Sequence, residues 1–132
     1  MSPELDRALC ERYPKIFSDR HEPEALSCMY RGFEVDDGWY QLIDVLCEEL
    51  QRESDQDNAP QIVAMQVKEK LGSLRFRVRS ASERQRGMIQ MAEALSTRLC
   101  VDCGAPCERE SETEYWRSPK CQGHHSEEAA RN

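Results

Sequence analysis

The chain has 132 residues, of which 33% are charged and 7% aromatic, and its formal net charge is −7 at pH 7. This length fits one domain, because a second hydrophobic core would leave both domains too small. The sequence has no apolar run of the roughly 20 residues that a membrane span needs and no secretion signal at its start. We therefore expect a cytoplasmic protein without a membrane partner.

Residues 1–30 are expected to form an N-terminal arm that docks on the main core. Leu5 and Leu9 give a short amphipathic stretch, and Pro14 and Pro23 interrupt any longer helix.

A helix is predicted from Trp39 to about Glu53, because apolar residues recur there at spacings of three and four. These residues are Trp39, Leu42, Ile43, Leu46 and Leu50. Asp36 or Asp37 is expected to cap its first turn, and the polar tract 54–60 is predicted to be a loop.

Two runs of alternating apolar residues then predict an antiparallel β-hairpin with Gly72 and Ser73 near its turn. The residues expected on its covered face are Val63, Met65 and Val67 in the first strand and Leu74, Phe76 and Val78 in the second.

A second helix is predicted to begin after Ser80 or Ser82, each followed three residues later by a residue that completes a capping box. Its inward-facing residues are expected to be Met88, Met91, Ala92, Leu95 and Leu99. Together these elements predict an α+β fold, with residues 1–99 forming a core in which two helices cover one face of a small antiparallel sheet.

The most specific pattern is Cys100-x2-Cys103, followed after seventeen residues by Cys121-x2-His124. Such spacing is typical of zinc sites, and Gly104 would let the backbone double back beneath the ion. Four protein ligands leave no open coordination position, so the pattern predicts structural rather than catalytic Zn²⁺. Seven cysteines in a cytosolic chain are not expected to form a disulfide framework.

Cys107 and His125 are rival ligands, and His124 ranks first because Cys-x2-His repeats the spacing of the first pair. The alternative is a set of buried or incidental thiols. We expect residues 100–125 to form a zinc-binding element packed on the core, with Trp116 against it, and residues 126–132 to be a disordered tail.

Charge is unevenly distributed, because residues 1–61 carry a net charge of −9, residues 62–99 of +5 and residues 100–132 of −3. The overall acidity argues against sequence-independent coating of DNA, which depends on neutralising phosphates.

Within the basic segment, Arg75, Arg77 and Arg79 alternate with apolar residues along the second predicted strand, and Lys68 is expected opposite them. Guanidinium groups about 7 Å apart along a strand would suit a nucleic acid or an acidic partner.

The alternative interpretation of these arginines is a solvated face, balanced by acids of the first predicted helix. The acids considered for this role are Glu48, Glu49 and Glu53.

The sequence resembles a group of small proteins from tailed phages and prophages. The resemblance rests on the segments 32–44 and 67–76, and on a Cys-x2-Cys-Gly element with a later Cys-x2-His element. Arg77 stands where the group tends to have an aromatic residue, and Cys107 is an additional thiol. The resemblance implies a role in binding and modulating or inhibiting a host protein machine, in the host cytoplasm.

We therefore expect a non-enzymatic protein that binds a host protein or complex, since no base lies beside a nucleophile in the sequence. The alternative is a nucleic-acid-binding regulator that uses the arginine strand and the zinc element.

Overall fold

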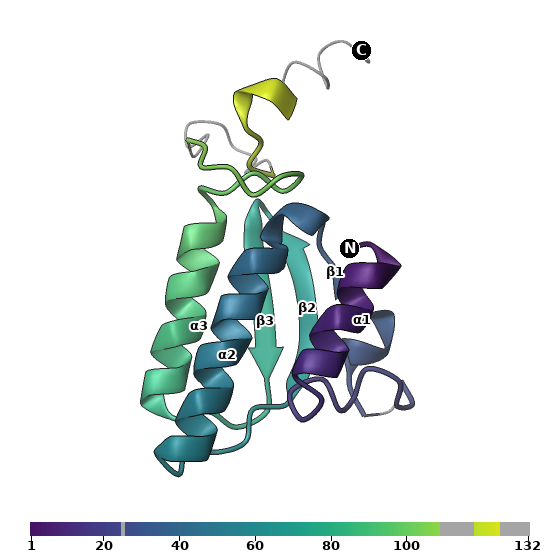
Figure 1. The fold of residues 1–132 in the computed structure, drawn as a ribbon, viewed down its shortest axis with the longest axis vertical. Helices are drawn as coiled ribbons and strands as arrows, with labels where there is room; N and C mark the ends of the chain where they lie inside the picture. Colours follow the sequence, from purple (N-terminus) through teal and green to yellow (C-terminus); the bar gives the residue numbers. More distant parts are fainter. Residues whose placement is uncertain (25, 109–117, 125–132) are drawn as a thin grey trace.

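The computed structural model describes residues 1–24, 26–108 and 118–124. The fold is α+β, as predicted, and Figure 1 shows a small sheet with helices on one of its faces. The elements in chain order are α1 (Pro3–Arg12), η1 (Cys28–Arg31), β1 (Phe33–Glu34), η2 (Asp37–Trp39), α2 (Tyr40–Gln56), β2 (Ala64–Lys70), β3 (Ser73–Val78) and α3 (Glu83–Ser96).

The sheet has three strands in the order β1-β2-β3, one more than the predicted hairpin. β2 and β3 are antiparallel, whereas β1 pairs with β2 in parallel. Phe33, Val67 and Phe76 are register partners across the three strands and lie on the helix-covered face. The ring of Phe17 packs on that face, 4.9 Å from the Phe33 ring centre. β1 spans two residues, too short for an alternating pattern to reveal it.

An irregularity in β2 makes part of the predicted alternation wrong. The register shifts between Ala64 and Gln66, so that Ala64 is fully buried while Val63 and Met65 are only partly buried. A bulge adds one residue to a strand and moves the preceding side chains to the opposite face. After the bulge the predicted alternation holds, and Val67 is fully buried.

The start and end of α2 also differ from the sequence-based expectation. Neither Asp36 nor Asp37 caps the helix with its side chain, and the Asp37 carboxylate instead accepts a hydrogen bond from the Ser2 backbone N–H at 2.7 Å. The helix continues to Gln56, so the first three residues of the predicted loop are helical. Ser54 supports this last turn by donating to the Leu50 carbonyl.

In α3 the capping box between Ser82 and Gln85 is confirmed. Met91 and Leu95, however, are 70% and 45% exposed and do not face the sheet. The buried residues of this helix are Gln85, Ile89, Ala92 and Ser96. The inward-facing side of α3 therefore includes two polar residues, which apolar periodicity does not reveal.

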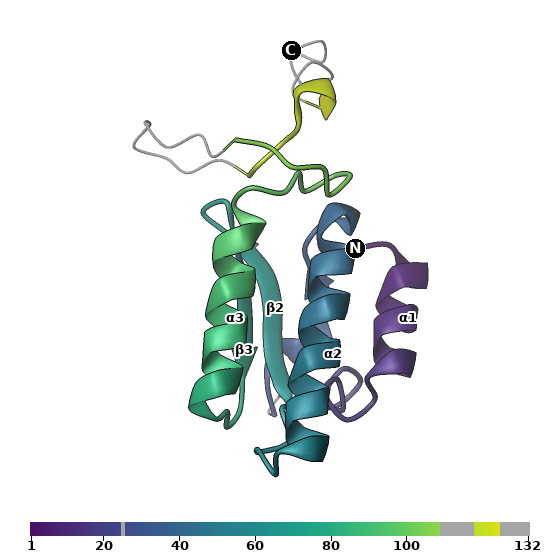
Figure 2. The same cartoon turned by 60° about the vertical axis from the view of Figure 1, so that its left-hand side comes forward.

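α1 is anchored to α2 by polar contacts at its C-terminal end. The hydroxyl of Tyr13 donates to the Asp44 carboxylate at 2.7 Å, and Arg12 pairs with the same carboxylate at 2.9 Å. Leu9, on the inward side of α1, is fully buried. Figure 2 shows α1, α2 and α3 side by side on the sheet, with residues 100–108 beyond the end of α3. Among the described helices, none has the length and apolar character needed to cross a membrane.

Candidate metal centre

A tight loop after α3 presents the first two cysteines. Leu99 and Pro106 form an isolated antiparallel bridge, and the Cys100 N–H donates to the Ala105 carbonyl at 2.8 Å. Gly104 has a φ of 78° and donates its N–H to the Cys100 carbonyl at 2.8 Å. Glycine adopts this left-handed conformation without the strain of a Cβ, so the chain doubles back here as predicted.

The loop lies directly against the start of α2. The Gly38 N–H donates to the Val101 carbonyl at 2.8 Å, and the Trp39 indole N–H donates to the Leu99 carbonyl at 3.0 Å. A Cβ on Gly38 would lie 2.3 Å from the Cys100 carbonyl oxygen. On Gly104, a Cβ would lie 2.6 Å from the Gly38 carbonyl oxygen. Two glycines therefore permit a backbone approach that no larger residue allows.

The second ligand pair arrives from residues 118–124. The Val101 N–H donates to the Pro119 carbonyl at 2.8 Å, and the Ser118 hydroxyl donates to the Glu69 carboxylate at 2.7 Å. Lys120 lies 3.7 Å from the Asp102 carboxylate. These contacts hold the segment beside the loop and direct its cysteine and histidine toward the first pair.

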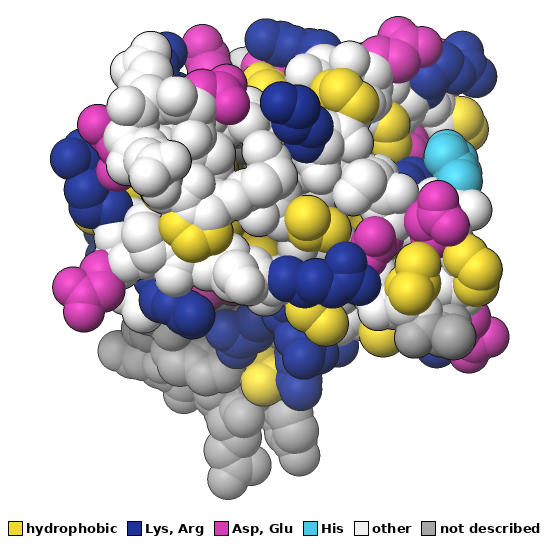
Figure 3. Space-filling model, turned by 90° about the horizontal axis from the view of Figure 1, so that it is seen from below, with side chains coloured by type: hydrophobic (Ala, Val, Ile, Leu, Met, Phe, Trp, Pro, Cys, Tyr) yellow, Lys and Arg dark blue, Asp and Glu magenta, His cyan; other side chains and the backbone are white. Residues whose placement is uncertain are grey.

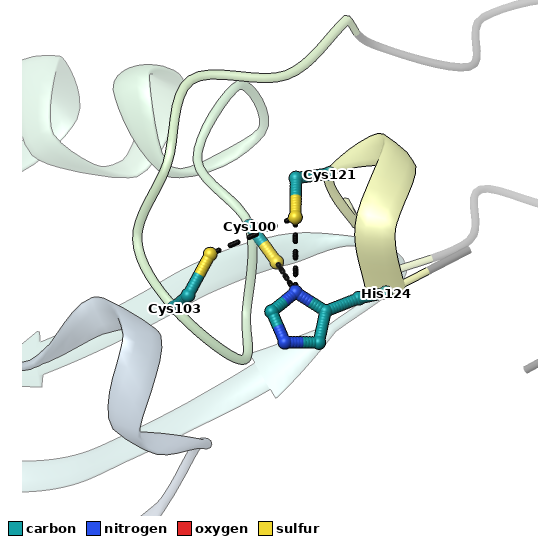
Figure 4. Close-up of side chains that lie close together, drawn as sticks. All are labelled: Cys100, Cys103, Cys121 and His124. Atoms are coloured by element: carbon teal, nitrogen blue, oxygen red, sulfur yellow. Dashed lines mark hydrogen bonds between the residues drawn. The ribbon is translucent and has the colours of Figure 1, made fainter. Parts of the chain in front are cut away.

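The four predicted ligands converge on one point (Figure 4), and their ligand atoms all lie within 4.8 Å of one another. The Sγ atoms of Cys103 and Cys121 are 3.6 Å apart, and the Nδ1 atom of His124 lies 3.3 Å from the Sγ of Cys100 and 2.9 Å from that of Cys121. A tetrahedral zinc ion would separate two sulfurs by about 3.8 Å and a sulfur and a nitrogen by about 3.6 Å. The cluster fits a metal ion after small side-chain adjustments.

The surroundings of the cluster favour the thiolate form at two cysteines. The pKa of Cys121 is lowered to about 6, first by a hydrogen bond from the His124 backbone and then by the His124 ring. Burial raises the pKa of Cys100, but three backbone hydrogen bonds outweigh it and the net shift is downward. The pKa of Cys103, in contrast, is raised. Thiolates are the metal-binding form of cysteine, so the surroundings favour cation binding at Cys100 and Cys121.

Of the two rival ligands, Cys107 is described by the structure and lies outside the cluster. Among the described residues, the group that is close enough together to hold a metal ion comprises Cys100, Cys103, Cys121 and His124, without Cys107. The Cys107 N–H donates to the Arg98 carbonyl at 2.8 Å, which helps to close the loop. His125 and Trp116 lie outside the described residues, as does the predicted tail 126–132.

The three arginines predicted to form one basic surface have different surroundings in the structure. Arg75 and Arg77 are exposed on the face of β3 opposite the helices, and their register partners on β2 are Lys68 and Gln66. Arg79, in contrast, lies 2.7 Å from the buried carboxylate of Asp19 and donates to the Leu26 carbonyl at 2.9 Å. Arg79 is thus engaged within the chain.

One further cation belongs to this surface. Lys70 is exposed, two residues beyond Lys68 on β2, and pairs in register with Ser73. The alternation of β2 could have identified it, because residues two apart on a strand share a face. We call Lys68, Lys70, Arg75 and Arg77 the basic sheet face. Figure 3 shows Lys and Arg side chains gathered near the centre of the lower half of that view.

The acids expected to balance the arginines are used elsewhere. Glu48 and Glu49 lie 3.5 and 2.6 Å from Arg52 within α2, and Glu53 pairs with Arg84 of α3 at 3.3 Å. No described acidic residue forms an ion pair with the basic sheet face.

Comparison of the sequence with known protein families, curated proteins and solved structures gave no match.

Proposed function

We propose that the four ligands hold one structural Zn²⁺ ion and that the chain acts by binding a partner protein through its basic sheet face. Three thiolates and one imidazole in tetrahedral arrangement are the donor set that zinc prefers. With four protein ligands, the ion has no open position for a substrate or an activated water, so the proposed role of the metal is structural and not catalytic.

The proposed ion stabilises a part of the chain that has little apolar packing of its own. Among the described residues, the hydrophobic core ends at Val101, and Cys103 is exposed. Binding free energy at a structural zinc site is folding free energy for the segments that supply its ligands. The ion would therefore fix residues 100–108 and 118–124 against the start of α2.

The observation that carries the partner proposal is the basic sheet face. It presents four cations on neighbouring strands, none of which forms an ion pair with a described acid, although Glu34 of β1 is the register partner of Lys68. Charged groups that are not paired within a protein are free to form complementary pairs with another molecule. The partner that fits is a protein with an acidic surface. For a phage-encoded chain, as the resemblance implies, it is a host protein machine such as a defence or nucleic-acid-processing complex, which the chain modulates or inhibits.

A protein partner is favoured over a nucleic acid by the rest of the charge distribution. Residues 1–61 and 100–132 carry net charges of −9 and −3. A polyanion that extends past the small basic sheet face would meet this negative field, whereas a compact acidic protein surface would not.

The test compares two double variants of equal charge. Arg75→Glu with Arg77→Glu reverses the centre of the basic sheet face, and Arg7→Glu with Lys15→Glu makes the same charge change at exposed positions in the N-terminal arm. Each protein is used to capture a partner from host lysate. The captured partner is then purified, and its affinity for the wild type and for each double variant is measured. We expect the first variant to lose binding and the second to retain it, with little loss of folding stability in either.

Equal binding by both double variants would contradict the proposal. So would tight binding of a short DNA duplex or single strand by the wild-type protein at about 0.15 M salt, where exposed charges are already screened. A steep loss of that binding with added salt would instead assign the face to nucleic acid.

A further inference from the structure

The outer side of α3 carries no charge over three turns, which is unusual in a chain with 33% charged residues. Between Arg86 and Arg98 its exposed residues are Gly87, Gln90, Met91, Ala94 and Leu95, which we call the α3 outer face. Met91 and Leu95 are 70% and 45% exposed. Figure 1 shows α3 at the edge of the helical layer, with α2 on one side of it. An apolar helix face of this kind is typical of a protein interface.

Gly87 is not explained by packing within the chain. A Cβ at this position would meet nothing within 4 Å, and the residue has no left-handed conformation that would require glycine. Glycine within a helix is less favourable than alanine. A glycine without an internal cause, on an uncharged and exposed helix face, indicates that another backbone approaches α3 closely at this point.

The charges at the two ends of α3 indicate what approaches. Glu83 is exposed in the first turn, and Arg98 is exposed in the turn that follows the helix. Neither forms an ion pair with a described residue. Arg84 and Arg86 are also exposed at the first end, and Arg84 pairs with Glu53 of α2 at 3.3 Å. Along the line through Gly87 and Ala94, the acid Glu83 stands at one end and the base Arg98 at the other, a pattern that complements its own reversed copy.

The spacing of the residues supports the same conclusion. Gly87 and Ala94 are each 3.5 residues, or about 5 Å along the helix, from the point midway between Gln90 and Met91. Glu83 and Arg98 are each 7.5 residues from it in the sequence, with Arg98 in the turn that follows Ser96. Around that midpoint a twofold axis would bring Gly87 beside Ala94 of the second copy, and Glu83 beside its Arg98. The two small residues would meet where the helices are closest, and the two Met91 side chains would cover each other.

We propose that the chain forms a homodimer in which the α3 outer faces of two copies pack antiparallel about a twofold axis between Gln90 and Met91. The interface would bury the exposed Met91 and Leu95 side chains and form two symmetry-related ion pairs between Glu83 and Arg98. The surface lies on the helix layer, and the basic sheet face on the opposite side of the sheet remains free. This inference does not depend on the proposed partner of that face.

Charge exchange tests the interface with the zinc-loaded full chain. Glu83→Arg sets two arginines against each other at both ends of the interface, and Arg98→Glu sets two glutamates against each other. Each variant alone should dimerise at least about tenfold more weakly than the wild type. An equimolar mixture of the two should form a heterodimer in which both ion pairs are restored, and the double variant should again form a homodimer.

Sedimentation velocity over about 1–200 µM, the range in which a micromolar dimer dissociates, gives the dissociation constants. A second variant, Gly87→Lys, separates loss of the dimer from loss of the fold. It replaces a helix-destabilising residue at an open position, so the thermal stability of the monomer should be kept or raised while dimerisation is lost. The proposal is overturned if the wild type stays monomeric throughout, if the single variants dimerise like the wild type, or if their mixture does not recover.

Discussion

Gly38 and Gly104 determine how closely the metal-binding loop approaches the start of α2. Each lies where a Cβ would overlap a backbone carbonyl group of the other segment. Backbone cannot move away as the end of a flexible side chain can, so a larger residue at either position must displace the loop. The ligand geometry therefore depends on residues that bind no metal.

A first prediction concerns Gly38→Ala. The added methyl group would lie 2.3 Å from the Cys100 carbonyl oxygen, so we expect a loss of about 2 kcal/mol in the free energy of unfolding and weaker zinc binding. Denaturant unfolding and competition with a chromogenic chelator measure the two effects. Gly87→Ala is the matched control, because its methyl group meets open space and should stabilise the monomer by about 0.5–1 kcal/mol. Equal effects of the two changes would show that the loop is not held by this contact.

A second prediction uses the Tyr13 hydroxyl, whose pKa is raised by burial and by its hydrogen bond to the Asp44 carboxylate. The hydroxyl stabilises the fold in its protonated form. That contribution is complete below the pKa of about 10 in the unfolded chain and is lost as the pH rises above it, at up to about 1.4 kcal/mol per pH unit.

Tyr13→Phe should therefore destabilise the protein by about 1.5–3 kcal/mol at pH 7, where the hydrogen bond to a charged group is intact. The difference from the wild type should shrink by about 1 kcal/mol or more between pH 10 and 11. Urea unfolding of both proteins across this range provides the measurement. A difference that is independent of pH would mean that the hydroxyl is not held in its protonated form by the fold.

The sequence predicted the ligands but not the contact that supports them. The spacing of Cys100, Cys103, Cys121 and His124 is a local pattern and could be read directly. Gly38 and Gly104 are 66 positions apart in the sequence but lie in contact. The sequence does not show which backbone segment either glycine contacts. Long-range contacts of this kind leave no periodicity.

At the scale of elements, Gln85 links three segments at one end of the molecule. Its amide nitrogen lies 3.0 Å from the Ser54 hydroxyl and 3.2 Å from the Pro60 carbonyl, while its amide oxygen accepts from the Ser82 backbone N–H. The residue is fully buried. The end of α2, the following loop and the start of α3 are thus held together by one side chain.

A third prediction follows for Gln85→Glu. A carboxylate would keep the acceptor of the capping box but would turn an acceptor toward the Pro60 carbonyl, where the amide donates. We expect a loss of about 3 kcal/mol in the free energy of unfolding at pH 7, because the second oxygen of the buried carboxylate would face the Pro60 carbonyl oxygen without a donor between them. Part of this loss should be recovered at pH 4, where the carboxyl group can be protonated. Gln41→Glu, at an exposed position of α2 outside the α3 outer face, serves as the control and should change stability by less than about 0.5 kcal/mol.

The main elements could be predicted from their apolar spacing, but the details of burial could not. α2, the β-hairpin and α3 all lie where their patterns indicated. The bulge at Ala64–Gln66 reversed the faces of Val63 and Met65, since a single extra residue changes the parity of a strand. In α3, hydrogen bonds allowed Gln85 and Ser96 to occupy buried positions, which left Met91 and Leu95 outside.

For the molecule as a whole, the described core and the metal centre rely on different interactions. The hydrophobic core is built from side chains up to Val101, whereas the loop beyond it is held by backbone hydrogen bonds and by the ligand cluster. Loss of the metal should therefore affect one end of the molecule first.

A fourth prediction concerns Cys103→Ser, which removes an exposed ligand without changing the core. We expect the variant to lose zinc, and the backbone amides of residues 100–108 and 118–124 to exchange hydrogen faster, while those of β2, β3 and the inner turns of α2 keep their protection. Hydrogen exchange followed by mass spectrometry resolves these segments. Cys10→Ser, at a cysteine outside the cluster, should leave zinc content unchanged. Unfolding of the whole chain by Cys103→Ser would show that the site anchors the core instead.

The coordination of the proposed Zn²⁺ ion can be measured by X-ray absorption at the zinc edge in the wild-type protein purified without chelators. We predict one zinc per chain with three sulfur neighbours at about 2.3 Å and one nitrogen at about 2.0–2.1 Å. The nitrogen shell should be lost in His124→Ala. Protein without bound metal, or a spectrum that requires an oxygen ligand from water in place of a protein side chain, would contradict a closed structural site.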